Sequence, residues 1–250
     1  MKKVLYFFLS SCLLAACATQ ENTPFDNPVM PDEANGMYDG SVPQTWWFLF
    51  TGKEPKLVLR DLKTDTDIQT LSVPAELKLP KAITYDGISL WVAGTGEGAG
   101  IYQLDPETGS VLNKLEIPTT SLSWDGSNVW YLDGQTLRSI SNDGKAGESY
   151  PIELPEDTKS VTKYKDVVYI FYGDLGYLRK YNLTTNQVEG EETTGLEDAL
   201  MIFVTQRNYS FTVPRGYFCS WGRHGSEMID IHIDHPGEVA TAMAPNEAIF

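Results

Sequence analysis

An aromatic residue beside apolar neighbours returns along this chain about every forty residues. The members of the series are Trp47, Trp91, Trp130, Tyr169 and Tyr209. The last four are separated by 39, 39 and 40 residues, and the first lies 44 residues before the second. A constant period of this length predicts a fold made of similar units, each of which buries its apolar face against its neighbours.

Each unit has the pattern of four short strands. Between Ala82 and Pro118, an Asp-Gly turn, a Gly-rich loop and a Pro-Glu-Thr-Gly turn separate four apolar or alternating segments. Four strands in about forty residues are typical of a β-propeller blade. We therefore predict an all-β protein, a β-propeller of about five blades with four antiparallel strands each, over residues 45–250.

The repeat also resembles known propellers. The aromatic-Asp-Gly turn, Leu90-Trp91-Val92-Ala93 and the Ile-Tyr-Gln-Leu-Asp-Pro-Glu-Thr-Gly run at 101–109 are similar to repeats of the bacterial YVTN, SMP-30-like and glutamine-cyclotransferase groups. The resemblance covers about residues 45–239. It implies the fold, a calcium ion near the axis for a lactonase-like member, and a catalytic glutamate for a cyclotransferase. The segment 79–83, which occupies a comparable place, contains no carboxylate.

The first residues have the pattern of a targeting signal. A basic start is followed by the apolar stretch 4–16, which is too short to span a bilayer. Leu14-Ala15-Ala16-Cys17 resembles a lipobox, and this resemblance implies a lipoprotein signal peptide over residues 1–16 with lipidation of Cys17. Cleavage after Ala18, as in an ordinary secretory signal, is the alternative. Residues 17–44 are rich in proline and polar residues, so we expect a flexible lipid-anchored tether.

Charge and cysteine content restrict the partners and the sources of stability. The formal net charge of −15 argues against nucleic acid and against docking on anionic headgroups. It is compatible with a basic partner or a divalent cation. Once the signal peptide and lipidated Cys17 are set aside, Cys219 is the remaining cysteine, so no intramolecular disulfide can form.

One segment has the residue types of a metal site. Asp230, His232 and Asp234 alternate with isoleucines, so a strand would place all three on one face. Carboxylate and imidazole groups ligate Zn²⁺. A half-buried strand with a wet face is the alternative, because side chains two residues apart diverge. Cys219 with His224 is interpreted as a small core residue near a histidine rather than a catalytic pair.

A second segment has the composition of a recognition surface. Tyr209, Arg215, Tyr217, Trp221 and Arg223 combine aromatic and basic side chains in an otherwise acidic chain. Such residues are enriched at binding hot spots. We expect residues 213–225 to form a long insertion in the fifth unit. The alternative is that the aromatic residues belong to the core of that unit.

These patterns favour a binding or scaffolding module over an enzyme. We expect an envelope lipoprotein, anchored in the outer membrane and facing the periplasm, whose partner is another envelope protein or a small ligand. The alternatives are a metal-dependent lactonase-like hydrolase or glutamine-cyclotransferase-like enzyme, and a component of an outer-membrane assembly complex.

Overall fold

The computed structural model describes residues 44–194, 199–204, 208–213, 217–222, 228–232 and 239–245, and between residues 203 and 241 it describes only the backbone of these ranges. The regular elements in this part of the chain are β-strands. Among the same residues there is no helix with the length and apolar character needed to cross a membrane.

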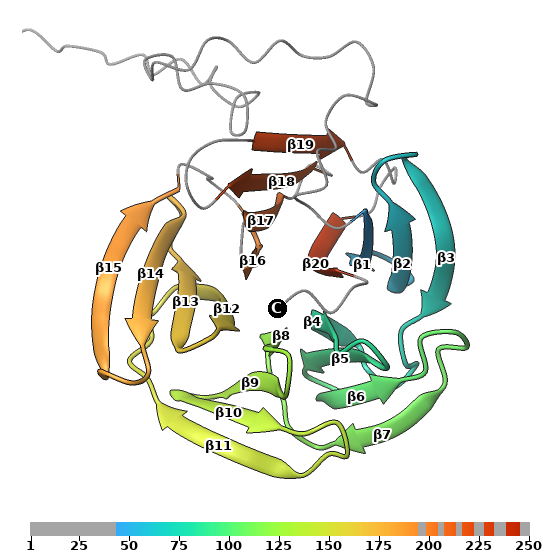
Figure 1. Cartoon of the computed structure of the whole chain (residues 1–250). Helices are drawn as coiled ribbons and strands as arrows, with labels where there is room; N and C mark the ends of the chain where they lie inside the picture. Colours follow the sequence, from blue (N-terminus) through green and yellow to red (C-terminus); the bar gives the residue numbers. More distant parts are fainter. Residues whose placement is uncertain are drawn as a thin grey trace, which may run out of the picture.

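The strands form five four-stranded antiparallel sheets arranged around a common axis (Figure 1). From the axis outwards, the sheets are blade 1 with β20 (Val239–Pro245), β1 (Thr45–Thr51), β2 (Lys56–Asp61) and β3 (Thr66–Ser72); blade 2 with β4 (Leu79–Tyr85), β5 (Leu90–Thr95), β6 (Gly100–Leu104) and β7 (Val111–Leu115); blade 3 with β8 (Leu122–Trp124), β9 (Val129–Asp133), β10 (Thr136–Ile140) and β11 (Ala146–Pro151); blade 4 with β12 (Thr158–Tyr164), β13 (Val167–Tyr172), β14 (Tyr177–Asn182) and β15 (Gln187–Thr193); and blade 5 with β16 (Met201–Val204), β17 (Asn208–Val213), β18 (Tyr217–Gly222) and β19 (Met228–His232). The predicted all-β propeller is confirmed.

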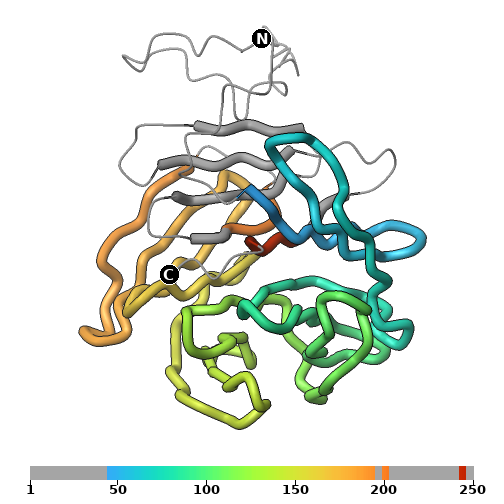
Figure 2. Tube along the Cα trace, turned by 45° about the vertical axis from the view of Figure 1, so that its right-hand side comes forward, coloured from blue at the N-terminus to red at the C-terminus, as the bar shows by residue number. Residues whose placement is uncertain are grey.

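Blade 1 is assembled from both ends of the propeller sequence. Its innermost strand is β20, which pairs antiparallel with β1 and places Trp47 opposite Ala244. Figure 2 shows the red C-terminal stretch lying against the blue start of the described chain. This pairing closes the ring, because β1 would otherwise present an open edge towards the axis.

Four of the five recurring aromatic residues occupy equivalent positions. All five lie on the second strand of their blade, and the four that share one register position, Trp47, Trp91, Trp130 and Tyr169, are at most 2% exposed. In blade 5 the prediction is wrong by one residue: the register gives the equivalent position in β17 to Ser210, opposite Phe203, and Tyr209 precedes it. The period therefore reports the packing of one blade on the next, where an aromatic side chain fills the interface.

Hydroxyl groups connect the inner strands of neighbouring blades. The Ser121 hydroxyl donates to the Val161 carbonyl at 2.6 Å and accepts from the Val161 amide at 3.0 Å. The Thr162 hydroxyl donates to the Ile202 carbonyl at 2.8 Å. These bonds satisfy backbone groups of β12 and β16, the inner strands, which each pair with only one neighbouring strand.

One prediction about blade 5 is wrong. The segment predicted as an insertion, 213–225, contains the strand β18 within 217–222, and this strand pairs with β17 and β19 as the third strand of a regular blade. Pro214 and Gly216 suggested a loop, but the strands on either side pair antiparallel, with Val213 opposite Tyr217.

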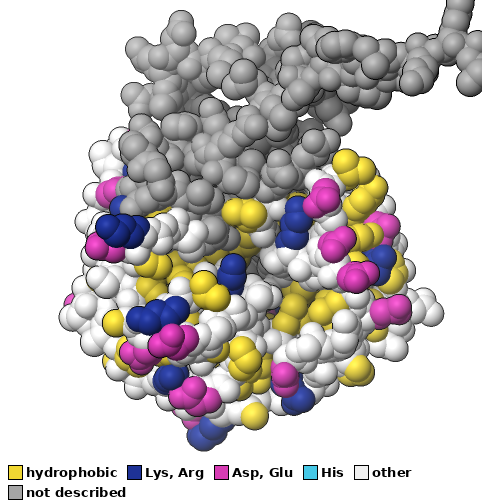
Figure 3. Space-filling view, turned by 180° about the vertical axis from the view of Figure 1, so that it is seen from behind, with side chains coloured by type: hydrophobic (Ala, Val, Ile, Leu, Met, Phe, Trp, Pro, Cys, Tyr) yellow, Lys and Arg dark blue, Asp and Glu magenta, His cyan; other side chains and the backbone are white. Residues whose placement is uncertain are grey.

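The surface differs between rim and centre. Seen from behind, most charged side chains, of both signs, lie along the outer rim, whereas hydrophobic side chains and a few Lys or Arg side chains lie around the hollow near the axis (Figure 3). A rim of mixed charge keeps the outer strands soluble and discourages edge-to-edge pairing.

Candidate functional site

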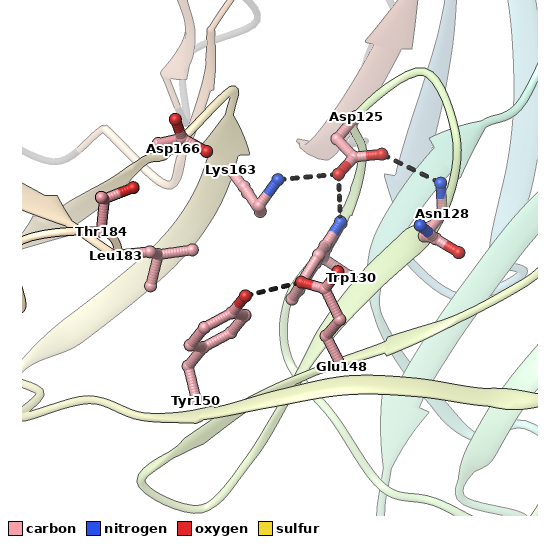
Figure 4. Close-up of a pocket in the computed structure, with 9 residues that line it drawn as sticks. All are labelled: Asp125, Asn128, Trp130, Glu148, Tyr150, Lys163, Asp166, Leu183 and Thr184. Atoms are coloured by element: carbon pink, nitrogen blue, oxygen red, sulfur yellow. Dashed lines mark hydrogen bonds and ion pairs between the residues drawn. The ribbon is translucent and has the colours of Figure 1, made fainter.

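A polar groove lies between blades 3 and 4, with a volume of about 270 Å³ (Figure 4). We call it the inter-blade groove. Blade 3 and its turns contribute Asp125, Asn128, Trp130, Glu148 and Tyr150, and blade 4 and its turns contribute Lys163, Asp166, Leu183 and Thr184. The groove opens on the face that carries the turns between the first and second and between the third and fourth strands.

A buried ion pair joins the two blades at the base of the groove. The Lys163 ammonium lies 2.8 Å from Oδ2 of Asp125, and both side chains are 10% exposed. The same oxygen accepts a 2.6 Å hydrogen bond from the Trp130 indole N–H. The ammonium also lies 4.5 Å from the centroid of the Trp130 ring, within range of a cation–π interaction.

These contacts keep Asp125 ionised. Burial raises the pKa of the Asp125 carboxyl. Hydrogen bonds from Lys163, the Asn128 amide and Trp130, together with the charge of Lys163, lower it by more, so the pKa lies below its ordinary value. The carboxylate and the ammonium therefore neutralise each other. Neither is left to bind an ion of the opposite charge.

The groove exists because two bulky side chains of the preceding interface are replaced. Between blades 2 and 3, Gln103, which pairs with Trp91, reaches the Asn142 carbonyl of the next blade at 3.1 Å. The equivalent residue, paired with Trp130 in blade 3, is the shorter Ser139. Trp124 ends the inner strand of blade 3, and its register equivalent in blade 4 is Lys163. At the interface of blades 3 and 4, Ser139 and Lys163 therefore leave space that Gln103 and Trp124 fill at the interface of blades 2 and 3.

The upper part of the groove carries negative charge. The Glu148 carboxylate accepts a 2.7 Å hydrogen bond from the Tyr150 hydroxyl. This bond, burial and the charges of Glu148 and Asp166 raise the pKa of Tyr150. Glu148 and Asp166 are both exposed, and within the described residues neither makes a salt bridge. Figure 4 shows Asp166 on the blade 4 side and Glu148 on the blade 3 side.

Sequence reasoning identified Asp125 only as a turn residue. The turn is present, because Oδ1 of Asp125 accepts from the backbone amides of Ser127 and Asn128 at 3.0 and 2.9 Å. Its second oxygen, Oδ2, makes the contacts with Lys163 and Trp130 at the blade interface. The signal that was overlooked is the spacing of five residues to Trp130, which Asp86 and Trp91 repeat with a 2.7 Å hydrogen bond.

The residues predicted as sites lie mostly elsewhere. In blade 5, Tyr209 lies on β17, and Tyr217 and Trp221 lie on β18. The register places Tyr209 opposite Trp221, one residue before Ser210, which has the position that buried aromatic residues hold in the other four blades. Residues outside the described part of the chain are Cys17, Arg215, Arg223, His224 and Asp234.

The residues of the predicted metal segment begin on the outermost strand of blade 5. Asp230 and His232 share one face of β19, with Asp230 opposite Cys219 and His232 opposite Tyr217. Among the residues that the structure describes, no group of three or more His, Cys, Asp or Glu side chains is placed to hold a metal ion.

Comparison with known proteins supports the fold. No model of a protein family matches the sequence, and no curated protein matches it. The chain is similar to a chain in the crystal structure of a nidogen/laminin complex, with a TM-score of 0.59, 9% identity, and coverage of 82% of this chain and 99% of that one.

Two further solved structures are similar. A protein of unknown function from Bacteroides caccae has a TM-score of 0.51 and 9% identity, with coverage of 82% of this chain and 99% of that one. Glutaminyl cyclase from Myxococcus xanthus has a TM-score of 0.48 and 11% identity, with coverage of 67% and 70%. At such identities the likeness concerns the fold alone, and the fold defines the class as a β-propeller.

Proposed function

We propose that this chain is an envelope lipoprotein whose propeller head is a binding module for another envelope protein, with the inter-blade groove as its recognition site. The observation that carries the proposal is the contrast between neighbouring interfaces. A side chain bridges blades 2 and 3 through Gln103, whereas the interface of blades 3 and 4 leaves a polar groove of about 270 Å³. A rigid, concave site with a few fixed polar groups is the usual form of a recognition site.

The anchoring half of the proposal depends on Cys17. Its support is the lipobox-like segment at 14–17 and the proline-rich stretch that follows, which would let the head stand off the lipid surface. Ala18, rather than an aspartate, follows the cysteine. That residue favours the outer membrane in hosts that sort lipoproteins by this position.

Replacing Cys17 with serine is expected to release the protein from the membrane. In a bacterial host, we expect the parent protein to begin at Cys17 with acyl chains added to its mass, and to partition into the detergent phase. The variant should lose both properties, because the thiol that carries the lipid is gone. Cys12→Ser, a change within the predicted signal, is the control and should stay lipidated. A Cys17→Ser protein that still carries the acyl mass and still partitions into the detergent phase would contradict lipidation at this residue.

A photoreactive residue in place of Thr184 is expected to cross-link the partner in intact envelopes. Thr184 lines the groove, so a bound protein would lie within reach of the label. The control position is Glu156, an exposed residue in the connection that leads from blade 3 to blade 4 on the opposite face. A discrete product from position 184 alone is expected by immunoblotting and mass spectrometry. The same products from both positions, or none from position 184, would count against the groove as the recognition site.

A further inference from the structure

We propose that the inter-blade groove selects the guanidinium group of an arginine side chain presented by the partner polypeptide. This inference rests on the proposed role of the groove in recognition and names the chemistry that it recognises. The first argument is the charge that remains after the internal pairing. The lining has three carboxylates, Asp125, Glu148 and Asp166, and one ammonium, that of Lys163. Because Lys163 and Asp125 lie 2.8 Å apart and neutralise each other, two negative charges remain.

The two remaining carboxylates face one space from different blades. Glu148 lies on β11, and Asp166 follows β12 in the turn to β13. Both act on the same phenol, since their charges contribute to the raised pKa of Tyr150. A cation that enters between them would contact carboxylates on both walls. A guanidinium group suits this arrangement because its five N–H donors spread in a plane and can reach two acceptors.

Size and surface character favour a single side chain. The volume of about 270 Å³ lies below the roughly 300–1,000 Å³ of pockets that hold drug-sized ligands. Tyr150 lines the groove and packs on Trp130, with ring centroids 5.9 Å apart. A planar guanidinium can stack on such an aromatic wall while it pairs with the carboxylates. Glu148 and Asp166 are exposed, so the group can enter from solvent.

The net charge of the chain supports a basic partner. At −15, the protein attracts cationic surfaces over the range that salt allows, roughly 10 Å at 0.1 M. Long-range attraction brings the partner close, and the groove then distinguishes arginine from other residues. Binding should therefore weaken as the salt concentration rises.

The test uses the Trp130 indole resonance of the full-length lipidated protein in detergent micelles. This N–H donates to Asp125 at 2.6 Å at the base of the groove, so its chemical shift reports on occupancy. The ¹⁵N-tryptophan protein is titrated with the capped tripeptide Gly-Arg-Gly, and Trp130→Phe assigns the signal. The matched ligand contains citrulline, which has the shape of arginine without its charge. We expect a saturable shift with arginine and binding about tenfold weaker with citrulline, as two partly exposed ion pairs imply.

Variant pairs isolate the two carboxylates. Glu148→Gln with Asp166→Asn is expected to reduce the affinity for the arginine peptide to that of the citrulline peptide. The control, Glu156→Gln with Asp157→Asn, removes the same charge from exposed residues on the opposite face and should change the affinity less than about twofold. Equal binding of arginine and citrulline, equal loss in both double variants, or no saturable shift would overturn the inference.

Two further measurements distinguish a polypeptide arginine from a free guanidinium compound, and the selectivity of the groove from its role in recognition. Methylguanidinium that binds while the arginine peptide does not would overturn the assignment to a polypeptide. A Thr184 cross-link that survives Glu148→Gln with Asp166→Asn would leave the groove as a recognition site but overturn its selectivity for arginine. Charge-dependent peptide binding without any cross-link would instead support the selectivity and remove the proposed envelope partner.

Discussion

A chain that ends at residue 238 is expected to lose the folded propeller. The deletion removes β20, which supplies the innermost strand of blade 1 and pairs with β1 from Trp46 to Thr51. Ala242, Met243 and Ala244 are fully buried, as is Trp46. Without them the edge of β1 and the aromatic core of blade 1 would face water. Near-ultraviolet circular dichroism should lose its tertiary signal, and limited proteolysis should cut throughout the blades.

Two matched chains test whether the strand itself matters. A chain that ends at Pro245 keeps the whole of β20 and should retain the parent signal. A circular permutant that places residues 239–245 directly before Gln44 restores the strand at the other end and should fold without a C-terminal β20. A protease-resistant chain ending at residue 238 would show that the ring does not need this closure.

Replacing Lys163 with methionine is expected to lower the free energy of unfolding by about 2–3 kcal/mol. The substitution keeps most of the aliphatic chain but leaves the Asp125 carboxylate without its charged partner, in a site where both side chains are only 10% exposed. The groove admits solvent on one side, so we place the effect at or below the lower end of the range for buried ion pairs. Urea unfolding, followed by tryptophan fluorescence, measures the change.

The same comparison has a defined pH dependence. The folded pKa of Asp125 is lowered, so its ionised form stabilises the fold at pH values above the unfolded pKa of about 3.9. That stabilisation is lost as the pH falls through the lower, folded pKa. The difference between the parent and Lys163→Met should therefore be largest near neutral pH and shrink below about pH 4.

Lys114→Met serves as the control for both measurements. The Lys114 ammonium lies 2.9 Å from Glu116 and 5.2 Å from the Tyr102 ring centroid, so it makes the same kinds of contact as Lys163. The Glu116 side chain is 76% exposed, and water screens the pair. We expect little change in stability. An equal loss in both variants would indicate that burial adds nothing at Lys163.

The architecture could be predicted from the sequence because blades 1 to 4 each place a buried aromatic side chain at the same position. Trp91 and Trp130 fill successive interfaces and therefore repeat at the blade length, and Asp-Gly turns repeat with them. The closing strand β20 could not be found this way. It supplies the missing fourth strand of blade 1 from the far end of the chain, and pairing between distant segments leaves no local pattern.

The groove could not be predicted for a different reason. It arises where the repeat is broken, by Ser139 in place of a glutamine and by Lys163 in place of an aromatic residue. A single sequence shows these substitutions but does not show that both act on one interface, because register and blade neighbours are needed to align them. The ion pair of Asp125 with Lys163 could not be predicted either, because a role in a turn is sufficient to explain the Asp125-Gly126 pair.

The position of β20 also has a consequence for the order of synthesis. Blades 2, 3 and 4 are each continuous in sequence and can form as the chain grows. The outer three strands of blade 1 are made before the other blades, yet they wait for β20, which follows blade 5 in the sequence. Three strands must remain without their inner partner until residues 239–245 have been made, so a chain terminated before them would carry an exposed, adhesive sheet.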